Sequence, residues 1–239
     1  MQRLRIRFAK RGRLRFTSHR DFQRALERAV RRAGVPVAYS AGFSPHPRIS
    51  YAGAAPTGAA SEAEYLEIAL TRVEDPERVR AALDAALPDG LDVLAVVPAE
   101  GAGFAERLQA SHWQIEMPGL GAAELGAAVD AFLARGTVEV QRRTKSGLRT
   151  FDVRGAVVVA EVADRVAQVD GGPCAILRVV VRHTTPAVRP DDVLTAVRSQ
   201  ADLAPPSPPR MTRLAQGPLD GTSGAVADPL APGPGVVGA

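Results

Sequence analysis

The order of expected strands and helices repeats along the chain, and this repetition limits the possible folds more than any other feature. Residues 2–9 alternate apolar side chains with arginines, which is the pattern of a half-buried strand. A helix follows, with Ser18 as its cap and Gly34 as its stop. The first half then continues with a strand over 35–40, a rigid loop over 42–47, a strand over 64–71, a helix over 76–87 and a strand over 91–97.

The second half of the chain shows the same succession. Its expected elements are a strand over 112–117, a helix over 122–135, strands over 137–143 and 175–183, a helix over 190–201 and a weak strand over 211–214. Residues 156–163 fit either an extra strand or a hairpin arm. We therefore predict an α+β protein formed by tandem duplication, with two ferredoxin-like (βαββαβ) units that have antiparallel sheets.

These patterns divide the 239 residues into three parts. The first ferredoxin-like unit, with a basic N-terminal half, is expected over residues 1–105, and the second over 106–216. Residues 217–239 have no periodicity and only two charged side chains. We predict that they form a disordered C-terminal tail.

The composition argues against several classes of protein. No apolar run approaches the ~18–20 residues that a membrane helix needs, and the N-terminal residues lack the apolar core of a signal peptide. We therefore expect a cytoplasmic protein with no membrane partner. The single cysteine, Cys174, excludes an internal disulfide framework and a cysteine-based iron–sulfur or zinc site. Four scattered histidines and the absence of phosphate-loop or dinucleotide motifs predict neither metal nor cofactor.

Positive charge is concentrated at one end of the sequence. Residues 1–50 hold thirteen of the thirty Lys and Arg residues but only two acids, whereas residues 51–105 hold three basic and ten acidic residues. A uniform bias of the genome toward arginine codons would not produce this contrast. The basic segment predicts a surface for an anion, most plausibly RNA.

The first helix and the first strand both carry arginines on the side opposite their apolar residues. Arg20, Arg24, Arg28 and Arg31 would form one face of the helix, where only two acids offset them. Ser18 and His19 stand at the helix start, where backbone amides attract anions, although ordinary capping is the alternative. The first-strand stripe would lie on the open face of the sheet; it comprises Arg3, Arg5 and Arg7 and is extended by Arg13.

A compact loop from Tyr39 to Arg48 follows, in which prolines flank His46 and Gly42 supplies backbone freedom. Phe43 is expected to be either a buried anchor or a stacking platform. In the second half, Lys145 belongs to a basic loop whose alternative is a solvated hairpin tip. The residues predicted to bind RNA or another anionic ligand are Arg3, Arg5, Arg7, Arg13, Ser18, His19, Arg20, Arg24, Arg28, Arg31, Tyr39, Gly42, Phe43, His46, Arg48 and Lys145.

Residues 17–22, the helix segment 28–33 and the run from Gly42 to Arg48 resemble the radical-SAM-associated protein family. This domain of unknown function occurs alone or fused behind a cobalamin-binding radical SAM enzyme. With looser matches elsewhere, the resemblance spans residues 1–215. It implies a cobalamin-binding radical SAM partner and a setting near RNA processing, but no established activity. Because the chain lacks a cysteine triplet, it is not the radical enzyme itself.

The expected tandem fold is also similar to that of the CRISPR repeat-processing endoribonucleases, which cleave RNA without metal. His19 occupies a place comparable to their histidine near the first helix. Our leading hypothesis is a non-catalytic RNA-binding accessory protein that presents tRNA or rRNA to a radical SAM enzyme. The alternatives are a metal-independent endoribonuclease with His19 or His46 as general base, and a protein-interaction module for an acidic partner.

Overall fold

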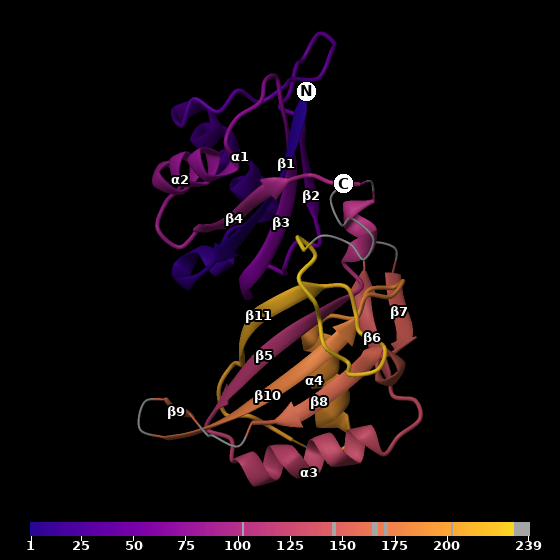
Figure 1. Ribbon diagram of the computed structural model, residues 1–239. Helices are drawn as coiled ribbons and strands as arrows, with labels where there is room; N and C mark the ends of the chain where they lie inside the picture. The colour runs from indigo at the N-terminus through magenta and orange to yellow at the C-terminus, as the bar shows by residue number, and fades with distance from the viewer. Residues whose placement is uncertain (102, 145–146, 164–166, 170–171, 202, 232–239) are drawn as a thin grey trace. The chain divides into compact units, whose positions relative to one another are not determined.

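The computed structural model describes residues 1–101, 103–144, 147–163, 167–169, 172–201 and 203–231 (Figure 1). It divides into two compact units. The first comprises Met1–Leu108 and the segment that begins at Asp228, and the second comprises Gln109–Ala227. Within the described residues the chain is a mixed α+β protein with four α-helices and mostly antiparallel strands. No helix in this part of the chain is long and apolar enough to cross a membrane.

The first unit is a sheet covered on one face by two helices. The strand order is β4-β1-β3-β2, with antiparallel pairing throughout. Two short 3₁₀ segments, η1 and η2, precede α1 and follow β4. The bounds are β1 Gln2–Lys10, η1 Gly12–Phe16, α1 His19–Arg32, β2 Ile49–Ala52, β3 Ala60–Leu70, α2 Pro76–Ala86, β4 Val93–Pro98 and η2 Phe104–Arg107.

Alternation along β1 determines which side of it faces the helices. Leu4, Ile6 and Phe8 are buried in one cluster with side chains of α1, β3 and α2. Helix α1 adds Phe22 and Leu26 to this cluster, and the Phe8 and Phe22 rings stack with centroids 4.4 Å apart. Both ends of α1 follow the sequence signals: the Ser18 hydroxyl accepts the Asp21 amide hydrogen, and Gly34 takes a positive φ of 64°.

The expected strand over 35–40 is wrong. Only two isolated bridges, Val37 with Leu70 and Tyr39 with Pro47, are found there, and the edge strand is instead β2. Pro36 has no amide hydrogen for a ladder, and the chain from Tyr39 turns back on itself at once, so that regular pairing with β3 begins only at Ile49.

The sheet face opposite the helices is not left open, as the sequence pattern suggested. Tyr65 of β3 and Phe104 of η2 lie buried against each other, with ring centroids 5.7 Å apart. Ala63 and Leu108 complete this cluster, and Leu230 packs against it. The C-terminal segment therefore covers part of the first unit's sheet.

This packing contradicts the prediction of a disordered tail from residue 217, as far as the described residues extend. Leu219 pairs with Val226 in an isolated bridge, and the Asp220 carboxylate accepts the amides of Thr222 and Ser223. The Ala231 carbonyl accepts a hydrogen bond of 2.6 Å from Arg107. Pro and Gly here form turns that tertiary contacts hold, an outcome that composition alone does not predict. Residues 232–239 lie outside the described residues.

In the second unit, the main sheet has the order β11-β5-β10-β8, with the short β9 beside β10. Helices α3 and α4 contact each other, and each buries one apolar face, with Leu125 and Phe132 on α3 and Val193 and Val197 on α4. The bounds are β5 Ala110–Pro118, α3 Ala122–Leu133, β6 Glu139–Thr144, β7 Gly147–Asp152, η3 Arg154–Ala156, β8 Val157–Val162, β9 Ala167–Val169, β10 Gly172–Arg182, α4 Pro190–Ser199 and β11 Arg210–Gly217.

The segment expected as the second strand of this unit lies outside its main sheet. β6 pairs with β7 in a separate hairpin, and β8 takes the edge position next to β10. Residues 139–144 alternate like any strand, so the sequence pattern does not reveal with which other strand they pair. The alternative of an extra strand over 156–163 corresponds to β8.

Candidate nucleic-acid interface

Helix α1 exposes a row of arginines. Arg20, Arg24 and Arg28 recur every four residues and are solvent-exposed, as is Arg31. None of the first three forms an ion pair or hydrogen bond with any described residue, whereas Arg31 donates to the Glu27 carbonyl at 3.2 Å. Residues at this spacing lie on one helix face, where their like charges repel. We call Arg20, Arg24, Arg28 and Arg31 the α1 arginine row.

The start of α1 is already occupied by its own side chains. Besides capping through its hydroxyl, Ser18 lies 2.6 Å from the Asp21 carboxylate. His19 contacts Gln23 through Nε2 at 3.1 Å and meets the Tyr51 ring edge to face, with centroids 5.0 Å apart. Burial, reinforced by the charge of Glu27, raises the pKa of Tyr51 above its ordinary range. This end therefore shows ordinary capping, and its histidine rests on an aromatic ring.

The loop from Tyr39 to Arg48 is closed at its base by Ser40 and His46. The Ser40 amide donates to the His46 carbonyl at 2.9 Å, and the Ser40 hydroxyl accepts the His46 amide hydrogen at 3.1 Å. The same hydroxyl lies 3.0 Å from Nδ1 of the His46 ring. We call this set of three contacts the Ser40–His46 clasp. Because the clasp fixes the base of the loop on both sides, it lowers the conformational entropy that the tip would lose on binding.

The tip of this loop displays aromatic surface to solvent. Phe43 is fully exposed, so of the two roles expected for it, that of a buried anchor is wrong. Tyr39 at the base is about half exposed (51%). Gly42 has a φ of 127°, which side-chain-bearing residues rarely adopt, and this turn carries the chain into Phe43. An exposed aromatic ring offers a surface on which nucleic-acid bases can stack.

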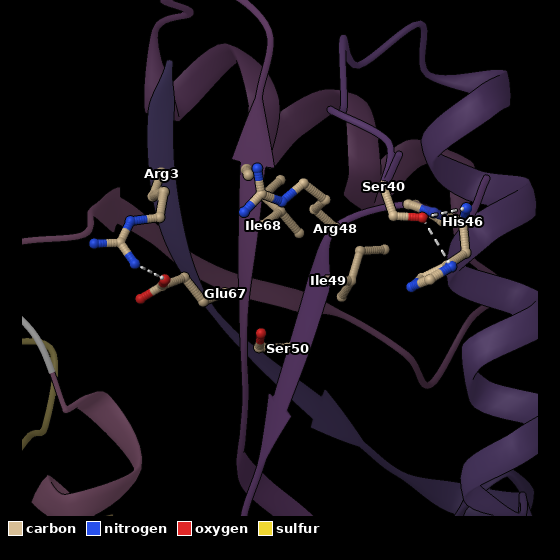
Figure 2. A pocket seen from close by; sticks show the side chains of 10 residues that line it. Arg3, Ser40, His46, Arg48, Ile49, Ser50, Glu67 and Ile68 are labelled. Atoms are coloured by element: carbon tan, nitrogen blue, oxygen red, sulfur yellow. Dashed lines mark hydrogen bonds and ion pairs between the residues drawn. The ribbon is translucent and has the colours of Figure 1, made fainter. Parts of the chain in front are cut away.

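A polar pocket of about 300 Å³ lies between this loop and the sheet (Figure 2). Arg3 on β1 and Glu67 on β3 form an ion pair of 3.1 Å at one side of it. The Ser40–His46 clasp stands at the other side, and Figure 2 shows Arg48 between the two pairs. The lining residues are Arg3, Ser40, His46, Pro47, Arg48, Ile49, Ser50, Glu67, Ile68 and Ala69. Three of the sequence-predicted residues, Arg3, His46 and Arg48, thus come together here.

The first-strand arginines do not form one stripe. Arg5 is only 2% exposed; its Nε lies 3.3 Å from Glu67, it donates to the Gly101 carbonyl, and its guanidinium sits 4.7 Å from the centre of the Phe104 ring. The expectation that Arg5 faces solvent is therefore wrong, because the η2 segment covers it. Arg7 is half-buried and donates to the Glu62 carbonyl at 2.8 Å. Arg13 is exposed, with no partner among the described residues.

Sequence reasoning missed the pocket's acid and its hydroxyls. No role was predicted for Glu67, which bridges Arg3 and Arg5. Its alternation with Tyr65 on β3 would have placed it on the face of the odd-numbered β1 arginines. No signal pointed to Ser40 or Ser50. Among the other acids of this half, Glu62 and Asp92 both pair with Arg11, and hydrogen bonding to Glu62 raises the pKa of that guanidinium.

The basic loop expected in the second half is only partly visible. Lys145 lies outside the described residues. Arg142 of the same hairpin is engaged: its guanidinium pairs with the buried Asp192 and lies 4.8 Å from the centre of the Phe151 ring. Asp192 also accepts the Arg189 amide at the start of α4, so this arginine holds a helix cap in place. Arg143 and Arg149 are exposed on β6 and β7.

Metal and thiol chemistry have little support in the described part of the chain. It contains no group of three or more His, Cys, Asp or Glu side chains that could hold a metal ion. Cys174 is buried, and burial raises the pKa of its thiol. His112 on β5 is half-buried, and its pKa is lowered, first by burial and then by the charge of Arg178. Neither group resembles an activated nucleophile or base.

Comparison with known proteins places this chain in a family. The model of a family described as "Uncharacterized protein conserved in bacteria (DUF2344)" matches residues 3–190. The chain belongs to the DUF2344 family. The match includes the α1 arginine row, the clasped loop and every pocket residue. No curated protein matches this DUF2344 chain. Among solved structures, one described as "Structure A of CRISPR endoribonuclease Cse3 bound to 19 nt RNA" is 13% identical, with 87% of this chain and 94% of that chain covered and a TM-score of 0.22.

Proposed function

We propose that this DUF2344 chain is a non-catalytic RNA-binding protein whose first unit contacts the RNA. The observation that carries the proposal is the α1 arginine row, in which three exposed guanidinium groups have no partner among the described residues. Two other arginines of the same unit have acids as partners: Arg72 pairs with Glu74, and Arg80 with Glu77. A polyanion would relieve the repulsion along the helix and release counterions from its phosphates.

The finer fold and partner assignments belong to the same proposal. We infer that both units are ferredoxin-like. This is supported by the strand orders β4-β1-β3-β2 and β11-β5-β10-β8, and by the two helices that connect strands in each unit. We also propose that the RNA is tRNA or rRNA and that the chain serves a cobalamin-binding radical SAM enzyme in the cytoplasm. The class of RNA and the enzyme partner rest on the sequence resemblance alone.

The test is retention of total cellular RNA by the purified full chain over a salt series, with chelator present. If the α1 arginine row contacts phosphates, log affinity should fall against log salt with a slope of about −3 or steeper. Retained RNA should stay intact and identify the ligand on sequencing. RNA binding that is absent or insensitive to salt would contradict the proposal.

The two alternative functions are separate outcomes of this experiment. Cleaved RNA in the presence of chelator would favour a metal-independent endoribonuclease, for which His46 in the polar pocket is a better placed base than His19 against Tyr51. Binding to an acidic protein that is lost on charge reversal of α1, with no RNA affinity, would favour an interaction module.

Phe43 provides a prediction that separates binding from folding. Phe43→Ala should lower RNA affinity about tenfold, because base stacking on an aromatic ring contributes ~1–3 kcal/mol. The free energy of unfolding should change by less than ~0.5 kcal/mol, since the ring is fully exposed. Fluorescence anisotropy and urea unfolding measure the two quantities. The matched control is Val73→Ala, another exposed apolar side chain of the same unit; an equal loss of affinity there would contradict a specific role for Phe43.

A further inference from the structure

The polar pocket has a surplus of positive charge. Glu67 is its one carboxylate, and it is shared between Arg3 at 3.1 Å and Arg5 at 3.3 Å. Arg48 brings a further guanidinium whose only side-chain hydrogen bond with a described residue is to the Met1 sulfur, at 3.7 Å. Two guanidinium groups, those of Arg3 and Arg48, therefore line the pocket against one carboxylate, which the buried Arg5 also engages although it does not line the pocket.

Neutral hydrogen-bonding groups stand around this charge. The Ser50 hydroxyl has no hydrogen-bond partner among the described residues. His46 is held through Nδ1 by Ser40, which leaves Nε2 on the opposite side of the ring (Figure 2). If the serine donates its proton to Nδ1, the neutral ring carries its own proton on Nε2 and can donate it. The pocket thus offers donors from the loop and from β2.

The volume sets the size of what can enter. About 300 Å³ lies at the lower end of the range for small-molecule pockets, roughly 300–1,000 Å³. One nucleotide unit or its phosphate fits this scale, whereas a folded RNA element does not. Arg48 joins the loop to β2, so a ligand in the pocket lies beside the clasped loop that displays Phe43.

We propose that this pocket binds the phosphate monoester of a nucleotide, either at the end of an RNA or on a free nucleotide. A monoester carries about −1.5 to −2 charges at pH 7 and three acceptor oxygens, which suit two lining guanidinium groups whose one carboxylate is already shared with Arg5. An internal phosphodiester carries a single charge and fewer free oxygens, so it offers the two lining guanidinium groups fewer acceptors. For the RNA arm this inference rests on the proposed function; for the free nucleotide it does not.

The test uses the full chain and one short single-stranded RNA, labelled internally, with a 5′-phosphate, a 3′-phosphate or hydroxyls at both ends. At least one phosphorylated probe should bind about tenfold more tightly than the hydroxyl probe, as expected for charge-assisted hydrogen bonds to a second phosphate charge. Arg48→Gln should abolish this difference. Arg78→Gln, an exposed arginine on α2, is the matched control and should preserve it.

Each remaining outcome decides between the two proposals. Equal affinity for the three probes would overturn the monoester pocket and leave RNA binding intact. If no probe binds, the proposed function fails, and calorimetry with nucleoside monophosphates then decides about the pocket. Saturable binding that is lost in Arg48→Gln would support it, and no binding would overturn it. Circular dichroism of the variant checks that the fold is unchanged.

Discussion

Replacing Arg20, Arg24 and Arg28 together by glutamine is expected to lower RNA affinity at low salt by about 100-fold. Each of these guanidinium groups is exposed and lacks a partner in the described part of the chain, so each can contact a phosphate without breaking an internal interaction. Every lost phosphate contact should reduce the slope of log affinity against log salt by ~0.7 for single-stranded RNA. Anisotropy titrations over a salt series measure both quantities, and the slope should become shallower by about two.

The change in the slope of log affinity against log salt tests this prediction more strictly than a loss of affinity alone would. A variant that merely unfolded would lose binding at all salt concentrations, whereas these substitutions should leave the melting temperature unchanged or slightly raised, because like charges at four-residue spacing repel. The control is Arg72→Gln with Arg78→Gln, which removes positive charge from the same unit away from α1. If the control pair changes the slope by as much per charge removed as the α1 substitutions do, RNA binding follows net charge and the assigned surface is wrong.

Arg5→Met is expected to destabilise the protein by about 3 kcal/mol, the cost of breaking a buried ion pair by removing one partner. The methionine leaves Glu67 with Arg3 alone, leaves the Gly101 carbonyl without its donor, and removes the cation from the Phe104 ring. Thermal unfolding followed by circular dichroism should show a melting temperature lower by about 6–12 °C.

Arg3 provides the comparison for Arg5, since both pair with the same carboxylate. The Arg3 side chain is 56% exposed, so Arg3→Gln should change stability by less than ~1 kcal/mol. Equal destabilisation by the two substitutions would show that the η2 segment does not hold Arg5 in the way described. Arg3→Gln should lower RNA affinity more than Arg5→Met does, because only the exposed guanidinium of Arg3 can reach a ligand.

Local patterns were sufficient to predict most of the elements. The alternation in residues 2–9, the Ser18 cap and Gly34 stop correspond to β1 and α1 within a residue or two. The failures involve a choice of partner. The 35–40 segment was expected to be a regular strand, but it meets the end of β3 only through the bridge of Val37 with Leu70 before the chain turns into its loop. Likewise, β6 pairs with β7 rather than with the main sheet. Pairing partners depend on tertiary packing, about which a strand's own residues say little.

The residues of the candidate site show the same difference between features set by local sequence and features set by tertiary packing. The α1 arginine row followed from helical spacing, because the apolar face of an amphipathic helix packs on the core and its polar face lies on the opposite side. Arg5 could not be separated from Arg3 by any local signal, since its burial comes from η2, about a hundred residues further along the chain. The polar pocket also joins β1, β2, β3 and the clasped loop, and only the fold brings Glu67 beside Arg3.

The packing of Leu230 against Tyr65 and Phe104 has a consequence for the order in which the protein can be made. A ribosome adds ~5–20 residues each second, so the segment from Asp228 emerges on the order of ten seconds after Leu108. During that interval the nascent first unit holds its sheet, helices and arginines but lacks its last covering segment. Translation of the whole second unit must therefore precede completion of the first.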